Sequence, residues 1–247
     1  MTKSIFFLQK FSAVLCFLFL FSLSSALAQE SDGLKSDLSD TFREMNLVRL
    51  DNQETLRRIE NSQTVSIQTG KRNFEITLTP RDLRSSRYVA EDTSALGTRR
   101  LERAPVTTYR GKIVGEQNSE VRLTIDGTKI EGYFISRDGE FFIEPASRFS
   151  NLAAAADFVV YQEKDLIPSS GFSCGITEKI ESGREFVAPN IESGTQTMRV
   201  VEMGTDADFE FVNALGGAAQ ANSEILNILN MVEGVYESEL GLTLSIN

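Results

Sequence analysis

The sequence contains no histidine and no tryptophan among its 247 residues. Without histidine, the residues present include no HExxH zinc motif, no Ser-His-Asp triad and no Cys-His pair. They also lack the side chain that most often serves as a general base near neutral pH. Most hydrolytic mechanisms are therefore excluded for these residues acting alone.

Positive charge is also scarce, because 25 Lys and Arg stand against 35 Asp and Glu, for a formal net charge of −10. Nucleic acids and anionic membrane surfaces attract Lys and Arg. We therefore expect no nucleic-acid partner. The remaining composition, with 41% hydrophobic residues and 17 Phe, is that of a globular protein able to bury a core.

Residues 1–28 have the pattern of a signal peptide. Lys3 and Lys10 form a basic start, residues 11–23 are an apolar run, and Ala28 ends an Ala-x-Ala cleavage site. The run is shorter than the roughly 20 residues that span a bilayer. We therefore expect a secreted or periplasmic protein without a stable membrane anchor. Cleavage removes Cys16, so Cys174 becomes the only thiol.

This interpretation predicts the N-terminus of the exported chain. N-terminal sequencing of material recovered outside the cytoplasm should begin at Gln29, because signal peptidase cuts after the small residue at position 28. Recovery of a chain that still carries Met1 in a membrane fraction would contradict it.

The middle of the chain changes from helical to strand periodicity. Residues 29–60 are polar, with Leu38, Phe42 and Met45 at helical spacing, which predicts one short amphipathic helix. From about Thr64 the apolar residues alternate, which predicts a β-rich, mostly antiparallel core over about 64–162.

Two Asp-Gly pairs predict hairpins inside this core. Residues 121–125 alternate before Asp126-Gly127 and strand residues 129–136, and Asp138-Gly139 precedes a further strand. Asp-Gly is a strong hairpin signal because glycine tolerates the positive φ of a type I′ turn. One more strand is expected at 157–162.

The motifs of this region resemble a known prodomain. The segment 109–114 reads Y-R-G-K-I-V, a serine-led strand follows at 119–123, and Gly127, Gly132 and the F-I-E-P at 142–145 complete the series. In order and spacing it resembles the prodomain of reprolysin-type (adamalysin, or ADAM-like) zinc metalloproteases. Residues 29–176 would then be the propeptide.

Residues 173–177, S-C-G-I-T, resemble the cysteine switch of that family, although Ser173 replaces the usual Met. The resemblance implies that the Cys174 thiolate is an inhibitory ligand of the catalytic zinc, since thiolates bind zinc strongly. The alternative is that Cys174 is a small buried structural residue. Residues 177–197 would be the linker that contains the activation cleavage.

Residues 198–247 resemble the start of the family's catalytic domain. Apolar residues at three-and-four spacing predict a helix over 218–240, ended by Gly241, between strands at 199–205 and 242–246. Strand–helix–strand order favours a parallel pair. The expected fold class is α+β: an antiparallel β-rich prodomain followed by the strand–helix–strand beginning of an α/β metzincin domain.

The function implied by the resemblance is that of a zinc metalloendopeptidase precursor. Its catalytic domain would bind the propeptide, and the full-length protein would cleave peptide or protein substrates. Glu202 aligns with a position that binds structural calcium in many members, and its alternative is a solvated side chain. The H-E-x-x-H motif is not among these residues, so we expect an inactive N-terminal fragment. The alternative is a stand-alone exported prodomain-like protein that binds or inhibits a protease.

The predicted helix 218–240 has an apolar stripe that needs covering. The stripe comprises Ala221, Ile225, Ile228, Leu229, Val232, Val235 and Tyr236. With only two strands to pack against, we expect this stripe to be half-covered and residues 198–247 to be less stable than the β-rich core, which should fold without them.

Overall fold

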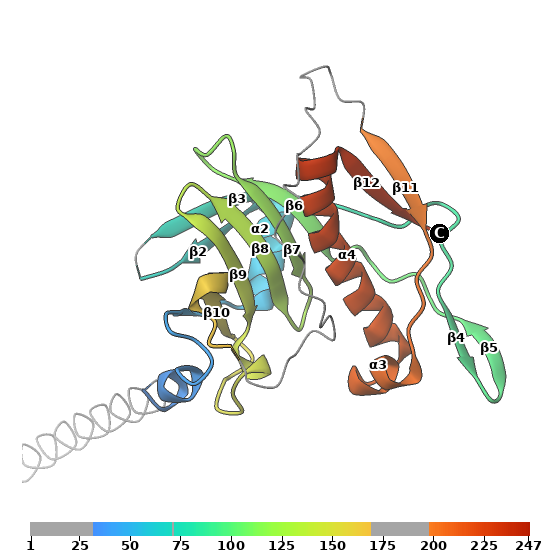
Figure 1. The fold of residues 1–247 in the computed structure, drawn as a ribbon, viewed down its shortest axis with the longest axis horizontal. Helices are drawn as coiled ribbons and strands as arrows, with labels where there is room; N and C mark the ends of the chain where they lie inside the picture. Colours follow the sequence, from blue (N-terminus) through green and yellow to red (C-terminus); the bar gives the residue numbers. More distant parts are fainter. Residues whose placement is uncertain (1–31, 71, 169–197) are drawn as a thin grey trace, which may run out of the picture.

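The computed structural model describes residues 32–70, 72–168 and 198–247 (Figure 1). We call residues 32–168 the barrel unit and residues 198–247 the tail. Cys174, the linker 177–197 and the signal peptide with Ala28 lie outside the described residues. None of the helices in the described ranges is long and apolar enough to cross a membrane.

The N-terminal part of the barrel unit contains two helical segments and a strand, so the expectation of a single helix in 29–60 is wrong. Residues 32–38 are helical, β1 spans Asn46–Arg49, and α2 spans Asn52–Ser62. Asp51 caps α2 by accepting a hydrogen bond from the Glu54 backbone N–H at 2.7 Å. Leu38 and Phe42 are buried as their spacing suggested, but Phe42 lies beyond the helix and forms a β-bridge with Leu166.

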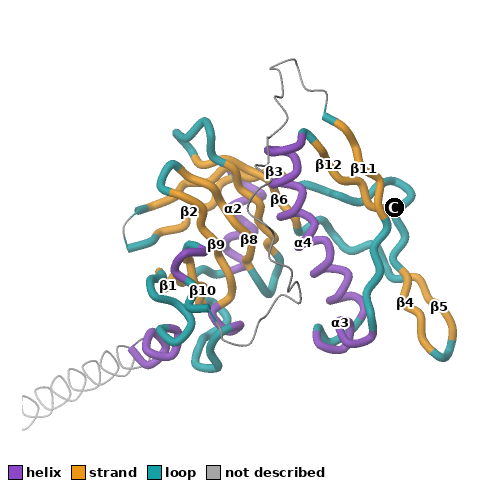
Figure 2. The backbone as a smooth tube through the Cα atoms, viewed as in Figure 1, coloured by secondary structure: helices purple, strands orange, loops and turns teal. Residues whose placement is uncertain are grey.

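An eight-stranded antiparallel sheet forms the rest of the barrel unit, in the order β1-β10-β9-β8-β7-β6-β3-β2. It curls into a nearly closed barrel (Figures 1 and 2). The edge strands β1 and β2 are linked at one end, where the Gly70 N–H donates to Asn46 Oδ1 at 3.0 Å. The strands are β2 Thr64–Gln68, β3 Asn73–Pro80, β6 Thr108–Ile113, β7 Glu120–Ile125, β8 Ile130–Ser136, β9 Gly139–Pro145 and β10 Asp157–Tyr161.

The strand alternation sorts residues between the two faces of this sheet. On β7, Val121, Leu123 and Ile125 point into the barrel, while Arg122 and Thr124 point outward. The interior is closed by α2 through Ile59. Its core includes Val65, Ile67, Phe74, Ile76, Leu78, Ile113, Ile130, Phe134, Ile143, Phe158 and Val160.

The two Asp-Gly hairpins form, but only the second has a glycine with positive φ. Residues 126–129 connect β7 to β8, and the Asp126 carboxylate accepts backbone N–H bonds from Thr128 and Lys129 at 2.6 and 2.9 Å. Gly127 therefore does not adopt the expected type I′ conformation, because the aspartate side chain organises a longer loop. Gly139, at φ 121°, follows the two-residue connection between β8 and β9.

Shorter elements complete the barrel unit. Two 3-10 turns span Ala146–Arg148 and Glu163–Asp165. A separate hairpin of β4, Glu91–Ser94, and β5, Gly97–Arg100, projects from the long connection between β3 and β6 (Figure 1).

The tail has the predicted strand–helix–strand order. Strand β11 spans Arg199–Met203, α3 Phe209–Ala214, α4 Ala218–Leu240 and β12 Leu242–Ile246. The pair β11–β12 is parallel, and Gly241 ends α4 in the left-handed conformation at φ 63°. The expected α+β class, with a large antiparallel sheet, is therefore confirmed, together with the parallel pair.

Helix α4 covers the outer face of the barrel at β6, β7 and β8, and packs with β12 on another side (Figures 1 and 2). The face turned to the barrel is not the apolar stripe. Its buried residues are Asn227, Asn230, Glu233 and Gly234. Of the stripe, Leu229 and Val232 pack with Leu83, Leu244 and Ile246, whereas Ile228, Val235 and Tyr236 are each 40% exposed.

The half-covered stripe is thus as expected. The docking of the tail on the barrel was not expected. Polar residues bury α4 against the outward side chains of β7, a contact that helical periodicity of apolar residues could not indicate. The tail is part of the folded unit in this structure.

Candidate functional site: the contact between the tail and the barrel

The centre of this contact is Glu233, whose side chain is completely buried. Its carboxylate accepts from Arg81 Nε at 2.9 Å and from Arg122 Nη1 at 2.8 Å. It also accepts from Thr243 Oγ1 at 2.7 Å and from the Leu244 backbone N–H at 3.0 Å. One carboxylate of α4 thus links two arginines of the barrel unit to strand β12 of the tail.

These partners determine the charge state of Glu233. Burial alone would raise its pKa, but the hydrogen bonds from Arg81, Leu244 and Thr243 and the charge of Arg81 lower it to about 2. Glu233 is therefore ionised in the folded protein at any ordinary pH.

Arg122 is the matching cation, with only 2% of its surface exposed. It lies on the outward face of β7 and pairs with Glu120 at 3.1 Å and with Glu233 and Glu237 of α4. Burial acts to lower the pKa of Arg122, but these carboxylates raise it above its ordinary value. A buried charge of this kind is tolerated only because it is paired.

Asparagines extend the polar contact along α4. Asn230 Nδ2 donates to the carbonyl oxygens of Tyr109 and Leu123, both at 3.3 Å. Asn227 Nδ2 donates to Glu131, a buried carboxylate on β8. Close approach of the helix is possible because residue 234 is glycine: a β-carbon there would lie 2.7 Å from Glu120 Oε1 and 2.8 Å from Arg122 Cγ.

A second charge cluster surrounds Glu131. Lys129 pairs with both Glu131 and Glu224 of α4, and Arg148 Nη2 lies 2.7 Å from Glu131 Oε2. Burial raises the pKa of Glu131 despite these cations. The cluster therefore adds a second buried acid to the contact surface.

Several buried oxygens at this contact have no hydrogen-bond partner among the residues that the structure describes. They are Thr124 Oγ1, Tyr133 Oη, Asn227 Oδ1 and Asn230 Oδ1. Protein cores rarely leave such groups unpaired, whereas contacts between separate folded units are more polar. The contact is therefore more polar than the apolar core inside the barrel.

Glu202, for which calcium was one interpretation, lies on the exposed strand β11. Its side chain is 61% exposed, pairs with Arg87 at 3.1 Å and accepts from Asn247 Nδ2 at 3.4 Å. Within 32–70, 72–168 and 198–247, no group of three or more His, Cys, Asp or Glu residues is placed to hold a metal. The described residues therefore do not form a catalytic zinc site, for which the chain also has no histidine.

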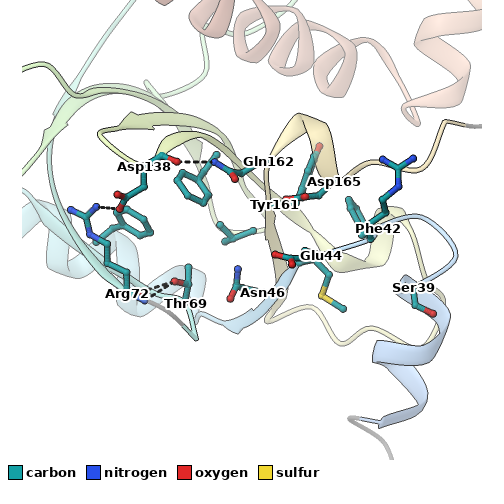
Figure 3. A pocket seen from close by; sticks show the side chains of 15 residues that line it. Ser39, Phe42, Glu44, Asn46, Thr69, Arg72, Asp138, Tyr161, Gln162 and Asp165 are labelled. Atoms are coloured by element: carbon teal, nitrogen blue, oxygen red, sulfur yellow. Dashed lines mark hydrogen bonds and ion pairs between the residues drawn. The ribbon is translucent and has the colours of Figure 1, made fainter.

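A pocket of about 660 Å³ opens at the end of the barrel where β1 and β2 approach (Figure 3). Phe42, Phe74, Phe141 and Tyr161 are among its lining residues. Its arginines already have partners: Arg72 pairs with Glu116 and Asp138 and lies over the Phe74 ring at 4.8 Å, and Arg43 donates to the Lys164 and Leu166 carbonyls. The polar groups at the mouth thus mainly hold the barrel end together.

Sequence reasoning did not identify the contact residues. In the sequence these polar residues stand between apolar ones and look solvated. They are Asn227, Asn230 and Glu233 of α4 and Arg122 of β7. Two signals point to them: Gly234 stands in a helix interior, where glycine is costly, and residues 218–240 contain acids but no Lys or Arg.

Comparison with known proteins adds no family to these observations. The chain matches no protein-family model, and no curated protein is significantly similar to it.

The low pKa of Glu233 predicts acid sensitivity. Its folded-state pKa of about 2 lies below the ordinary 4.5, so it stabilises the fold fully above pH 4.5, and the contribution is lost as pH falls toward 2. The loss should total roughly 3 kcal/mol. Urea unfolding measured between pH 6 and pH 2 should show this decline, and Glu233→Gln should reduce it. An identical pH profile in Glu233→Gln would assign the decline to other carboxylates.

Proposed function

We propose that this chain is the N-terminal part of a secreted zinc metalloendopeptidase precursor of reprolysin type. The barrel unit acts as the core of the propeptide, and the tail is the first strand, helix and second strand of the catalytic domain. The observation that carries the proposal is the order of three segments along the chain. An antiparallel barrel comes first, the Cys-Gly-Ile-Thr sequence at 174–177 follows it, and a parallel β11–α4–β12 unit comes last.

The buried contact with Glu233 supports the same assignment. A propeptide must hold its catalytic domain while the inhibitory thiol occupies the zinc, and the barrel unit binds the tail through Arg81, Arg122 and the outward face of β7. Cys174 is the residue proposed to contact the metal. The zinc would polarise water for peptide hydrolysis, with ligands and general base supplied by sequence beyond these residues.

The gene sequence following the codon for Asn247 tests this proposal. An H-E-x-x-H motif downstream supports the precursor. Its absence from every reading frame of the transcript favours the alternative, a stand-alone exported protein that binds a protease supplied by another gene.

The role of Cys174 has its own test. A synthetic peptide covering residues 169–178 should inhibit a reprolysin-type protease, and the same peptide with Cys174→Ser should not, because a hydroxyl is a much weaker zinc ligand than a thiolate. Equal inhibition by the two peptides would remove Cys174 from the mechanism.

A further inference from the structure

The ion pairs that join α4 to the barrel all have the same polarity. The carboxylates come from the helix, at Glu224, Glu233 and Glu237. The cations come from the barrel unit, at Arg81, Arg110, Arg122 and Lys129. Since α4 itself contains no Lys or Arg, its acids have no cationic partner within the helix. The barrel thus presents a cationic surface to an anionic helix.

A strand edge provides a second, independent contact. The Ile246 N–H of β12 donates to the Leu83 carbonyl, and the Ser85 N–H donates to the Ile246 carbonyl, both at 2.8 Å. Arg84 and Ile246 form a parallel bridge. The barrel unit therefore adds a short backbone edge to the β11–β12 pair, a mode of recognition in which main-chain bonds give affinity and side chains give specificity.

Shape provides a third contact. Gly234 has no side chain, so the helix surface there packs directly against Glu120, Arg122 and the Tyr133 hydroxyl. One turn earlier, Asn230 donates to the Tyr109 and Leu123 carbonyls. All these contacts join residues more than 80 positions apart in the chain, the nearest pair being Lys129 and Glu224, 95 positions apart. None of them requires a continuous backbone between the two units.

From these contacts we infer that the barrel unit binds the tail non-covalently, even when the two are on separate chains. Its partner is an acidic helix with a carboxylate at position 233, a glycine at 234 and an adjoining parallel strand edge. Cutting the backbone within 177–197 leaves a two-chain complex, so cleavage of the linker alone does not release the barrel. Naming that partner as a catalytic unit rests on the proposed function, while the binding itself does not.

A cleavable full-length chain tests this inference. A recognition sequence for a site-specific endopeptidase is placed within 177–197, and the folded chain is purified, cut and separated by size-exclusion chromatography. The two pieces should co-elute at low salt and at about 1 M salt, because buried ion pairs are screened only weakly. Separation of the wild-type pieces, with the barrel piece still folded by circular dichroism, would overturn the inference.

Variants show whether the charges carry the recognition. In the cut chain, Glu233→Gln should weaken association by about 100-fold or more, because Arg81 and Arg122 lose their common counter-charge. Glu239→Gln, an exposed position on the same helix, should bind like the wild type. Wild-type affinity in Glu233→Gln would refute the charge-based recognition.

A milder variant keeps the test decisive if Glu233→Gln does not fold. Glu237→Gln removes one partner of Arg122 at the edge of the contact and should weaken association by roughly 10-fold. Unchanged affinity there would contradict the inference. Absence of a downstream zinc motif would defeat the proposed function without affecting any of these binding results.

Discussion

Replacement of Glu233 by alanine should lower the free energy of unfolding by about 3–5 kcal/mol. The substitution leaves Arg122, which is 2% exposed, and the half-buried Arg81 without their common counter-charge. It also removes the acceptor for the Leu244 N–H and the Thr243 hydroxyl. Because the total stability of a domain is typically about 5–15 kcal/mol, a loss of this size should detach or unfold the tail.

Chemical denaturation of the variant measures this loss, with Glu239→Ala as the matched control. Residue 239 lies on the exposed side of the same helix, so its replacement should change stability by no more than about 0.5 kcal/mol. A double-mutant cycle with Arg122→Met adds a sharper criterion. Since the two residues are in direct contact, their combined cost should be smaller than the sum of the single costs. Strict additivity would contradict the contact.

The second large effect is expected for Gly234→Ala. In a helix interior this exchange normally stabilises by about 1 kcal/mol, because glycine has the greater freedom in the unfolded chain. At this position the new β-carbon would lie 2.7 Å from Glu120 Oε1 and 2.8 Å from Arg122 Cγ, and would also meet the Tyr133 hydroxyl. We expect a net destabilisation of about 1–3 kcal/mol, as for other overpacked contacts.

Ser238→Ala is the control for helix propensity. Its side chain is exposed and donates to the Val235 carbonyl, so alanine there should be neutral or slightly stabilising. Thermal unfolding of the two variants separates the effects. If Gly234→Ala stabilises the protein as much as a free helix would gain, the helix does not approach β7 this closely.

Local signals in the sequence predicted β11, α4 and β12 of the tail, but not the short helix α3. Gly217 and Gly241 bound a 23-residue helix, and the alternation at 242, 244 and 246 identifies the following strand. The parallel pairing follows from the length of the crossover, which allows the second strand to return beside the first. These features depend on residues close together in the chain, so periodicity and caps are sufficient.

The N-terminal strand was beyond such reasoning. Strand β1 has four residues, and its partner β10 lies more than 100 positions along the chain. Leu38, Phe42 and Met45 are at helical spacing, which suggested one helix. The packing of this segment depends instead on distant partners, among them Tyr161, whose ring centroid lies 4.7 Å from that of Phe42.

The buried face of α4 was missed for a related reason. A glutamate such as Glu233 is normally solvated, and only the arrival of Arg81 and Arg122 from the barrel unit makes its burial possible. The apolar stripe is real but faces β12 and the surface. Long-range charge pairing therefore decided the docking where hydrophobic periodicity predicted a different face.

Amide hydrogen exchange along α4 in the intact chain tests the central claim, that the tail is docked on the barrel through its polar face. The backbone amides of residues 227–234 should be strongly protected, because they open only when the contact with the barrel is lost. A helix held by its own hydrogen bonds would open far more easily. Rapid exchange across 227–234, with β7 still protected, would show that the tail is not docked and would contradict the account.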